Sequence, residues 1–178
     1  MSRRAAPDRV ALIGMMGSGK STIGRLLAAR TGWPFYDNDE LLEQATGLSA
    51  RNLLATLGER AMRAAEADAL LLGLNQPAPC IVGSAGGTIE DPELRRRLRE
   101  AASVVWLRAN PATTAVRAAG ADHRPWLGAD AEAWLDATAA RRSPLYRSVS
   151  NLTVDTDIQT ADEAAAFICD RLSLPSRA

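Results

Sequence analysis

The stretch GMMGSGKS, residues 14–21, constrains the fold of this chain more than any other feature. It places Gly14, Gly19, Lys20 and Ser21 in the spacing G-x-x-x-x-G-K-S, between an apolar run at 9–14 and a helical pattern at 19–32. With this composition, such a pattern is expected by chance on the order of 10⁻³ times in the chain. The arrangement therefore predicts a buried strand, a glycine-rich loop that binds phosphate, and a helix.

The chemistry of this loop depends on a lysine. Lys20 is the only lysine among the 21 basic residues, and all the others are arginines. A slim ammonium group can reach the β- and γ-phosphates of a nucleoside triphosphate through a crowded loop, where the planar fork of arginine would not fit. The Ser21 hydroxyl is a candidate ligand of Mg²⁺. The predicted nucleotide-binding residues of the loop are Gly14, Gly17, Ser18, Gly19, Lys20, Ser21 and Thr22.

Short apolar runs alternate with amphipathic stretches along the whole chain. The runs at 9–14, 34–36, 80–84, 103–107 and 151–156 have strand length, and helical patterns separate them. This alternation predicts an α/β fold, a parallel sheet with helices on both faces. The segment 41–74 reads as helical with turns at Gly47 and Gly58, and 120–130 reads as a loop. No repeat or long linker divides the chain, so residues 1–178 are expected to form one domain.

Composition limits the partners of the protein. The formal net charge is zero and the pI is about 6.6, which argues against broad electrostatic binding to nucleic acid or to an anionic membrane. No apolar run approaches the roughly 20 residues of a membrane span, and the N-terminus lacks the pattern of an export signal. Cys80 and Cys169 are expected to be free thiols. We expect a cytoplasmic monomer that binds small molecules.

Two carboxylates follow the second predicted strand, in FYDNDE. Because ligands of open α/β sheets bind at the carboxyl ends of the strands, Asp37 and Asp39 should face the phosphate loop. One carboxylate can hold Mg²⁺ through its waters, and the other can accept a proton from an attacking hydroxyl. The alternative is that one of them caps the helix that follows.

The order GMMGSGKSTIGRLLA, FYDND, GERAMRAAE, SAGGT, HRPWL and RRSPLYRSV resembles the shikimate kinase family over nearly the whole chain. The phosphate loop is common to many enzymes, whereas the combination of the other motifs is specific. The resemblance implies a P-loop kinase fold with a five-stranded parallel sheet. It also implies a substrate-binding helical segment at about 39–74 and a mobile lid at about 118–130. The implied reaction transfers the γ-phosphate of ATP to the 3-hydroxyl of shikimate, with Mg²⁺.

The resemblance also implies roles for individual residues. Asp37 would lie near Mg²⁺ with Ser21, and Glu66 would hold Arg63 in place. Arg124 would reach the transferring phosphate from the lid, and Arg117 would lie against the adenine. The implied catalytic residues are Lys20, Asp39 and Arg124. The implied substrate-binding residues are Asp39, Arg63, Gly86, Gly87 and Arg142.

Simpler explanations exist for several of these residues. Arg63 and Glu66 are three apart on a predicted helix and could form a surface ion pair of little value. Arg142 could complement a helix dipole, and Arg117 could be a solvated helical arginine. The run RRRLR at 95–99 is expected to be a solvated helix face. His123 has no assigned role, and the tryptophans expected to serve in packing are Trp33, Trp106 and Trp134.

The motifs depart from the family in the acceptor region. Ala85 replaces one glycine of the usual run of three, and Leu54 and Met62 stand where the family often has phenylalanine. Trp126 is bulkier than the leucine usual after R-P. These changes leave open a related enzyme acting on another hydroxylated acid or cyclitol, for example gluconate. A nucleotide-binding module without transferase activity is a further alternative, which the presence of Asp39 and Arg124 disfavours.

Overall fold

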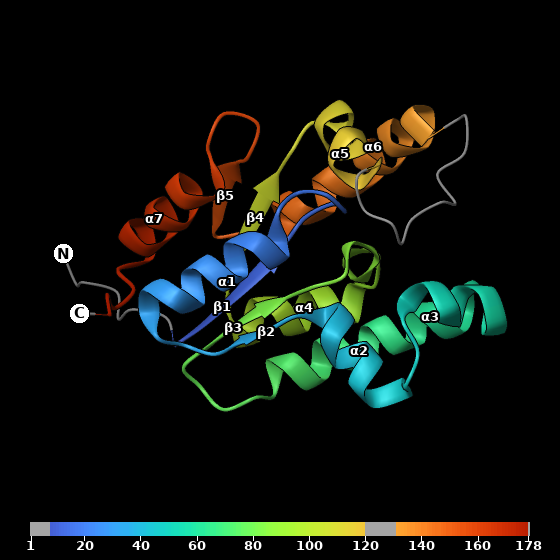
Figure 1. The fold of residues 1–178 in the computed structure, drawn as a ribbon, viewed down its shortest axis with the longest axis horizontal. Coiled ribbons are helices and arrows are strands. Elements are labelled where there is room, and N and C mark those ends of the chain that lie inside the picture. The colour runs from blue at the N-terminus through green and yellow to red at the C-terminus, as the bar shows by residue number, and fades with distance from the viewer. Residues whose placement is uncertain (1–7, 120–130, 178) are drawn as a thin grey trace.

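The computed structural model describes residues 8–119 and 131–177, and a parallel five-stranded sheet lies at the centre of this part (Figure 1). The strand order is β2-β3-β1-β4-β5, and every neighbouring pair is parallel. The strands are β1 (Arg9–Ile13), β2 (Phe35–Tyr36), β3 (Cys80–Gly83), β4 (Ser103–Arg108) and β5 (Leu152–Asp155). The predicted α/β class and the parallel sheet are confirmed.

Helices connect the strands, as the sequence predicts. They are α1 (Lys20–Thr31), α2 (Asn38–Thr46), α3 (Ala50–Leu74), α4 (Pro92–Ala101), α5 (Pro111–Ala119), α6 (Ala131–Val149) and α7 (Ala161–Leu172). Of the two turns predicted in 41–74, Gly47 ends α2 with φ 73°, and Gly58 interrupts α3 with φ 81° and ψ 173°. A 3-10 helix, η1 (Gly86–Glu90), follows β3 and was not predicted.

The sheet is buried on both faces, because successive side chains of a strand point to opposite sides. Along β1, Val10 and Leu12 pack with residues of α1 and α7. Ala11 and Ile13 pack on the other side with residues of α3, α4 and α6. Each fully buried leucine or isoleucine contributes about 1.5–3 kcal/mol relative to an exposed one, which explains why these runs are almost entirely apolar.

Parallel pairing also determines where the loops meet. Strands β2, β3 and β1 are neighbours, so their carboxyl ends lie at one edge of the sheet. The phosphate loop follows β1, Asp37 follows β2, and η1 follows β3. Three segments that are far apart in sequence therefore converge at this edge.

Residues 120–130, which form most of the predicted lid and include His123, Arg124 and Trp126, lie outside the described residues. Within 8–119 and 131–177, no helix combines the length and the apolar character needed to cross a membrane.

Candidate active site

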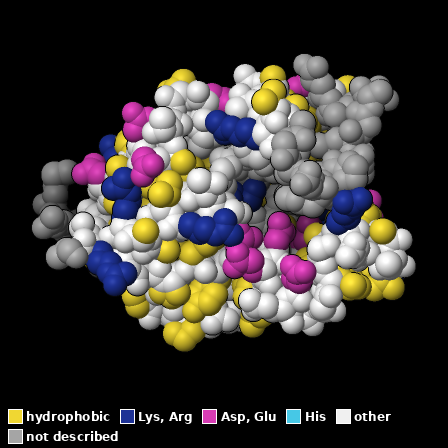
Figure 2. Space-filling model, viewed as in Figure 1, with side chains coloured by type: hydrophobic (Ala, Val, Ile, Leu, Met, Phe, Trp, Pro, Cys, Tyr) yellow, Lys and Arg dark blue, Asp and Glu magenta, His cyan; other side chains and the backbone are white. Residues whose placement is uncertain are grey.

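A cavity of about 1020 Å³ lies where the phosphate loop, α2, α3, η1 and α6 meet. In the space-filling view, acidic and basic side chains gather around a hollow on this face (Figure 2). The predicted site residues that line the cavity are Gly17, Gly19, Lys20, Ser21, Thr22, Asp37, Asp39, Arg63, Gly86, Gly87, Arg117 and Arg142. Gly14 and Ser18 belong to the same loop but not to this lining, and Arg124 lies outside the described residues.

The phosphate loop depends on glycine at both of its ends. A Cβ atom on Gly14 would lie 2.4 Å from the carbonyl oxygen of Leu107 and 2.7 Å from the Oγ of the fully buried Ser18. Gly19 caps the N-terminus of α1 with φ 93°, a backbone conformation that favours glycine. The Lys20 ammonium group donates hydrogen bonds to the carbonyl oxygens of Gly14 (2.9 Å) and Met15 (2.8 Å). The loop thus holds a cation against its own backbone, at the wall of the cavity.

Asp37 caps α2, as the simpler explanation proposed. Its Oδ1 accepts a hydrogen bond of 3.0 Å from the backbone N–H of Asp39, and the residue is buried. A carboxylate that caps a helix can still accept other interactions, because its two oxygens offer about four acceptor sites. Asp39 lies in the first turn of α2 and lines the same cavity. Both carboxylates therefore face the phosphate loop, at a helix N-terminus that favours negative charge.

The oxygen donors near the loop fit a magnesium ion that is bound together with nucleotide phosphates. Among the described residues, no group of three or more His, Cys, Asp and Glu side chains could hold a metal ion by itself. Mg²⁺ in phosphoryl-transfer sites commonly uses one or two protein oxygens, with waters and substrate phosphates completing the coordination. Ser21 and Asp37 supply a hydroxyl and a carboxylate to one cavity, beside Lys20.

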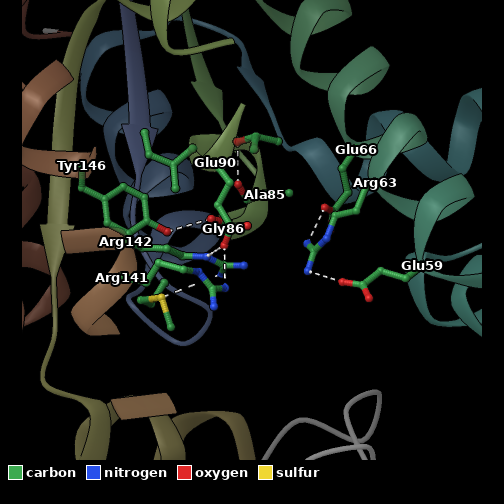
Figure 3. A network of polar contacts seen from close by, with 12 residues as sticks. Glu59, Arg63, Glu66, Ala85, Gly86, Glu90, Arg141, Arg142 and Tyr146 are labelled. Carbon is green, nitrogen blue, oxygen red and sulfur yellow. Dashed lines mark hydrogen bonds and ion pairs between the residues drawn. The ribbon is translucent and has the colours of Figure 1, made fainter. Parts of the chain in front are cut away.

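On the α3 side of the cavity, Arg63 pairs with two glutamates (Figure 3). Its Nη1 donates to Glu66 at 2.8 Å, and its Nη2 donates to Glu59 at 3.4 Å. The Glu66 side chain is only 10% exposed, so the alternative of a surface ion pair is wrong. Burial raises the pKa of Glu66 above its ordinary value, against the attraction of Arg63. Gly87 packs directly against this group, because a Cβ there would lie 2.1 Å from the Nη1 of Arg63.

On the opposite side, Arg142 is almost fully buried in the middle of α6. Its Nε donates to Glu90 at 2.6 Å, and its Nη1 lies 4.0 Å from the sulfur of Met15. The proposed interaction with a helix end is therefore wrong for Arg142. Glu90 also accepts a bond of 2.8 Å from Arg141. Glu90 had not been predicted, because nothing local to its position links it to residues about fifty positions further along the chain.

Tyr146 and Arg117 connect segments around the cavity through hydrogen bonds. The Tyr146 hydroxyl donates to the carbonyl oxygen of Gly86 at 2.8 Å, and its ring stacks on Trp106 at 5.7 Å between centroids. Arg117 is exposed, yet it donates to the carbonyl oxygens of Thr156 (2.8 Å) and Gly17 (3.4 Å). Arg117 is therefore not simply solvated, since it joins the phosphate loop to the segment after β5.

The structure tests the packing predicted for three tryptophans and the solvated face predicted for residues 95–99. Trp106 is buried and Trp33 packs on the sheet, as predicted. Trp134 is 41% exposed and lines the cavity, so the prediction that it serves in packing is wrong. Within 95–99, Arg96 is exposed and pairs along its own helix, in keeping with a solvated face. Arg95 instead donates to the carbonyl oxygens of Ile89 and Glu90, at the end of η1.

Known proteins resemble this chain over nearly its whole length. A family model described as shikimate kinase matches residues 16–173. A shikimate kinase of Symbiobacterium thermophilum is 37% identical over 169 residues, covering 92% of this chain and 95% of its own. One of Xanthomonas oryzae pv. oryzae is 40% identical, with 94% and 93% covered. The structure of an Acinetobacter baumannii shikimate kinase in complex with shikimate superposes with a TM-score of 0.88 and 29% identity, covering 93% of each chain.

Proposed function

The chain belongs to the shikimate kinase family and is a kinase, and we propose that it transfers the γ-phosphate of ATP to the 3-hydroxyl of shikimate. One observation carries the proposal. A single cavity holds a phosphate loop with its lysine, a carboxylate at Asp39, and two arginines, Arg63 and Arg142, that come from different helices. This set matches an acceptor that carries both a hydroxyl group and a carboxylate.

On the nucleotide side, we propose that the loop amides and Lys20 bind the β- and γ-phosphates, with Ser18 and Thr22 completing the loop. Ser21 and Asp37 would hold Mg²⁺, which neutralises phosphate charge when it is bound with ATP. Arg117 contacts the loop at Gly17, which supports a place beside the nucleotide. Arg124 remains a prediction for the transferring phosphate.

On the acceptor side, Arg63 and Arg142 would bind the carboxylate, and the backbone of Gly86 and Gly87 would lie along the ring. Guanidinium groups suit this role because their parallel N–H donors match the two oxygens of a carboxylate. Arg142 is almost fully buried and shares Glu90 with Arg141, so an acceptor without a carboxylate would leave a surplus positive charge at this group. This argues against an uncharged cyclitol as the acceptor.

The transfer step follows from these positions. Asp39 would accept the proton of the acceptor hydroxyl as that oxygen attacks the γ-phosphorus. The bond from the γ-phosphorus to the bridging oxygen breaks, and ADP leaves with the negative charge that Lys20 stabilises. Every group that we assign to this step belongs to one chain, so we propose that a monomer is active. Cys80 and Cys169 are free thiols, in keeping with a reducing cytoplasm.

The acceptor can be identified by measuring ADP release with ATP and Mg²⁺ in the presence of shikimate, quinate, gluconate or no acceptor. We expect release that depends on shikimate, with the Lys20→Ala variant as the inactive control. Leu54, Met62 and Ala85 all line the cavity, so a differently shaped acceptor is the second candidate. Release with gluconate alone would favour it, and equal release without any acceptor would refute acceptor phosphorylation.

A further inference from the structure

Glu90 lies at the end of η1, outside the cavity lining, and connects two consecutive arginines of α6 (Figure 3). One oxygen, Oε1, accepts both the bond from Arg142 Nε (2.6 Å) and the bond from Arg141 Nη2 (2.8 Å). Partial burial would raise the pKa of Glu90, but its bonds to Arg141 and Arg142 outweigh that effect and lower it. The carboxylate is therefore ionised at neutral pH and stays paired.

The backbone that carries Glu90 is fixed at both ends of η1. At the beginning, the Tyr146 hydroxyl donates to the carbonyl oxygen of Gly86 at 2.8 Å. At the end, Arg95 Nη1 donates to the carbonyl oxygens of Ile89 (2.6 Å) and Glu90 (2.9 Å). These bonds come from α6 and α4, so the position of the Glu90 carboxylate relative to α6 is well determined.

The bond to Glu90 decides which donors of Arg142 remain for an acceptor. Arg142 has five N–H donors, of which the one on Nε is used by Glu90. The other four are on the two terminal nitrogens, of which Nη1 also contacts the sulfur of Met15 at 4.0 Å, and Arg142 lines the cavity. Its side chain is only 5% exposed, so another orientation would bury the guanidinium without this partner.

The same short helix also touches the other arginine of the cavity. Gly87 packs against the guanidinium of Arg63, and Glu90, three residues later, binds Arg142. The contact with Arg63 and the bond to Arg142 are thus one turn of η1 apart. A rigid spacer of this kind determines the distance between two groups that would bind one carboxylate.

The charges around Glu90 leave a surplus for an anion. Arg141 and Arg142 share one carboxylate, so these three residues carry a net charge of about +1. Around Arg63 the charges are balanced differently, because two carboxylates, those of Glu59 and Glu66, both pair with that one arginine. The surplus positive charge is therefore on α6, shared between Arg142, which lines the cavity, and Arg141, which lies outside the lining and is largely exposed.

From this geometry we propose that Glu90 is a positioning residue, which holds Arg142 so that its two terminal nitrogens bind the carboxylate of the acceptor. The inference rests on the proposed function and deepens it, because it concerns how the acceptor is recognised. Glu90 does not contact the acceptor in this account and acts only through Arg142.

The test compares steady-state kinetics of Glu90→Gln with those of the wild-type enzyme. Glutamine keeps an oxygen that can accept from Arg142 but removes the negative charge that strengthens the bond, so KM for shikimate should rise about 10-fold, while kcat and KM for ATP stay within about twofold. Glu93→Gln is the matched control, because Glu93 pairs with Arg96 on the exposed face of α4 and should leave all three constants unchanged. In an Arg142→Ala background, Glu90→Gln should raise KM no further, as expected of a residue that acts through Arg142.

A second variant keeps the test decisive if Glu90→Gln folds poorly. Glu90→Asp retains the charge with a shorter reach, so its KM should lie between those of the wild type and of Glu90→Gln. An unchanged KM in either folded variant would overturn the proposal. A lower KM would also overturn it, because that would mean that Glu90 competes with the acceptor. An equally large rise in KM when Glu90→Gln is added to Arg142→Ala would overturn it too. The wild-type arm separately tests the proposed function, and the same ratios apply to whichever hydroxylated acid the wild type uses.

Discussion

Replacing Gly87 by alanine should damage the acceptor site without disturbing the fold. The backbone of Gly87 is not in the left-handed region, so alanine can adopt it. The new Cβ, however, would lie 2.1 Å from Nη1 and 2.7 Å from Cζ of Arg63. Since ordinary contacts of such atoms begin at about 3.5 Å, the guanidinium would have to move by about 1.4 Å.

The size of the effect follows from that displacement. A misplacement of about 1 Å can reduce turnover about 10²-fold, which corresponds to about 2.7 kcal/mol of transition-state stabilisation. The stability of the fold should change much less, because the displaced atoms are the end of a flexible side chain. Substituting alanine for glycine at a compatible position contributes about 0.4–1 kcal/mol in favour of folding. The loss should therefore be specific to catalysis.

The assay is kcat/KM for shikimate at saturating ATP, together with KM for ATP and a thermal melt. We expect the first to fall about 10²-fold and the other two to stay near the wild-type values. Gly86→Ala is a neighbouring comparison that tests the contact with Arg63, because its Cβ would meet the carbonyl oxygen of Gly14 at 3.3 Å and Met16 N and the Tyr146 hydroxyl at 3.6 Å instead. A Gly87→Ala enzyme within about threefold of wild type for shikimate would refute the assignment of Arg63 to the acceptor.

Three further predictions concern the loop, the base and the buried acid. Lys20→Ala should lower kcat/KM about 10²–10³-fold, and Lys20→Arg should not restore it, since a planar fork does not fit the loop; near-normal turnover of either would contradict the role of Lys20. Asp39→Asn should lower kcat about 10²–10⁴-fold while ATP binding, measured by calorimetry, is unchanged. An unchanged kcat would leave Asp39 with only its place at the start of α2. Because burial raises the pKa of Glu66 above 4.5, its protonation stabilises the fold fully below pH 4.5, and this contribution is lost as the pH rises through the raised value. Above pH 4.5, the free energy of unfolding measured with urea should therefore depend less on pH in Glu66→Gln than in the wild type. The same dependence on pH in both proteins would show that the pKa of Glu66 is not raised.

Much of the fold could be predicted because its signals are local. Apolar runs of strand length alternate with helical patterns, and this order leaves few arrangements other than a parallel sheet covered on both faces. Gly47 and Gly58 interrupt the helical segment at the predicted positions, because both adopt conformations that glycine favours. The position of the phosphate loop could be predicted for the same reason, since its strand, glycines and helix are contiguous in sequence.

The rest of the site depends on contacts between distant segments. Glu90 and Arg142 are 52 residues apart, and no periodic pattern links them. Burial separates Glu66 from the many helical glutamates that pair on a surface, yet burial is decided by how α3 packs. Trp134 looks like a packing residue by its chemistry and lines the cavity instead, because α6 presents it there. Asp37 both caps α2 and faces the cavity, so the two explanations that the sequence offered are compatible.

The central claim is tested most directly by identifying the product of the wild-type enzyme. The purified protein would be incubated with ATP, Mg²⁺ and shikimate, and the phosphorylated product examined by proton-coupled phosphorus NMR and mass spectrometry. We predict a phosphomonoester whose phosphorus couples to the proton on carbon 3 of shikimate, formed in equal amount to ADP. A phosphate on another hydroxyl, or ADP accompanied only by inorganic phosphate, would contradict the proposed function.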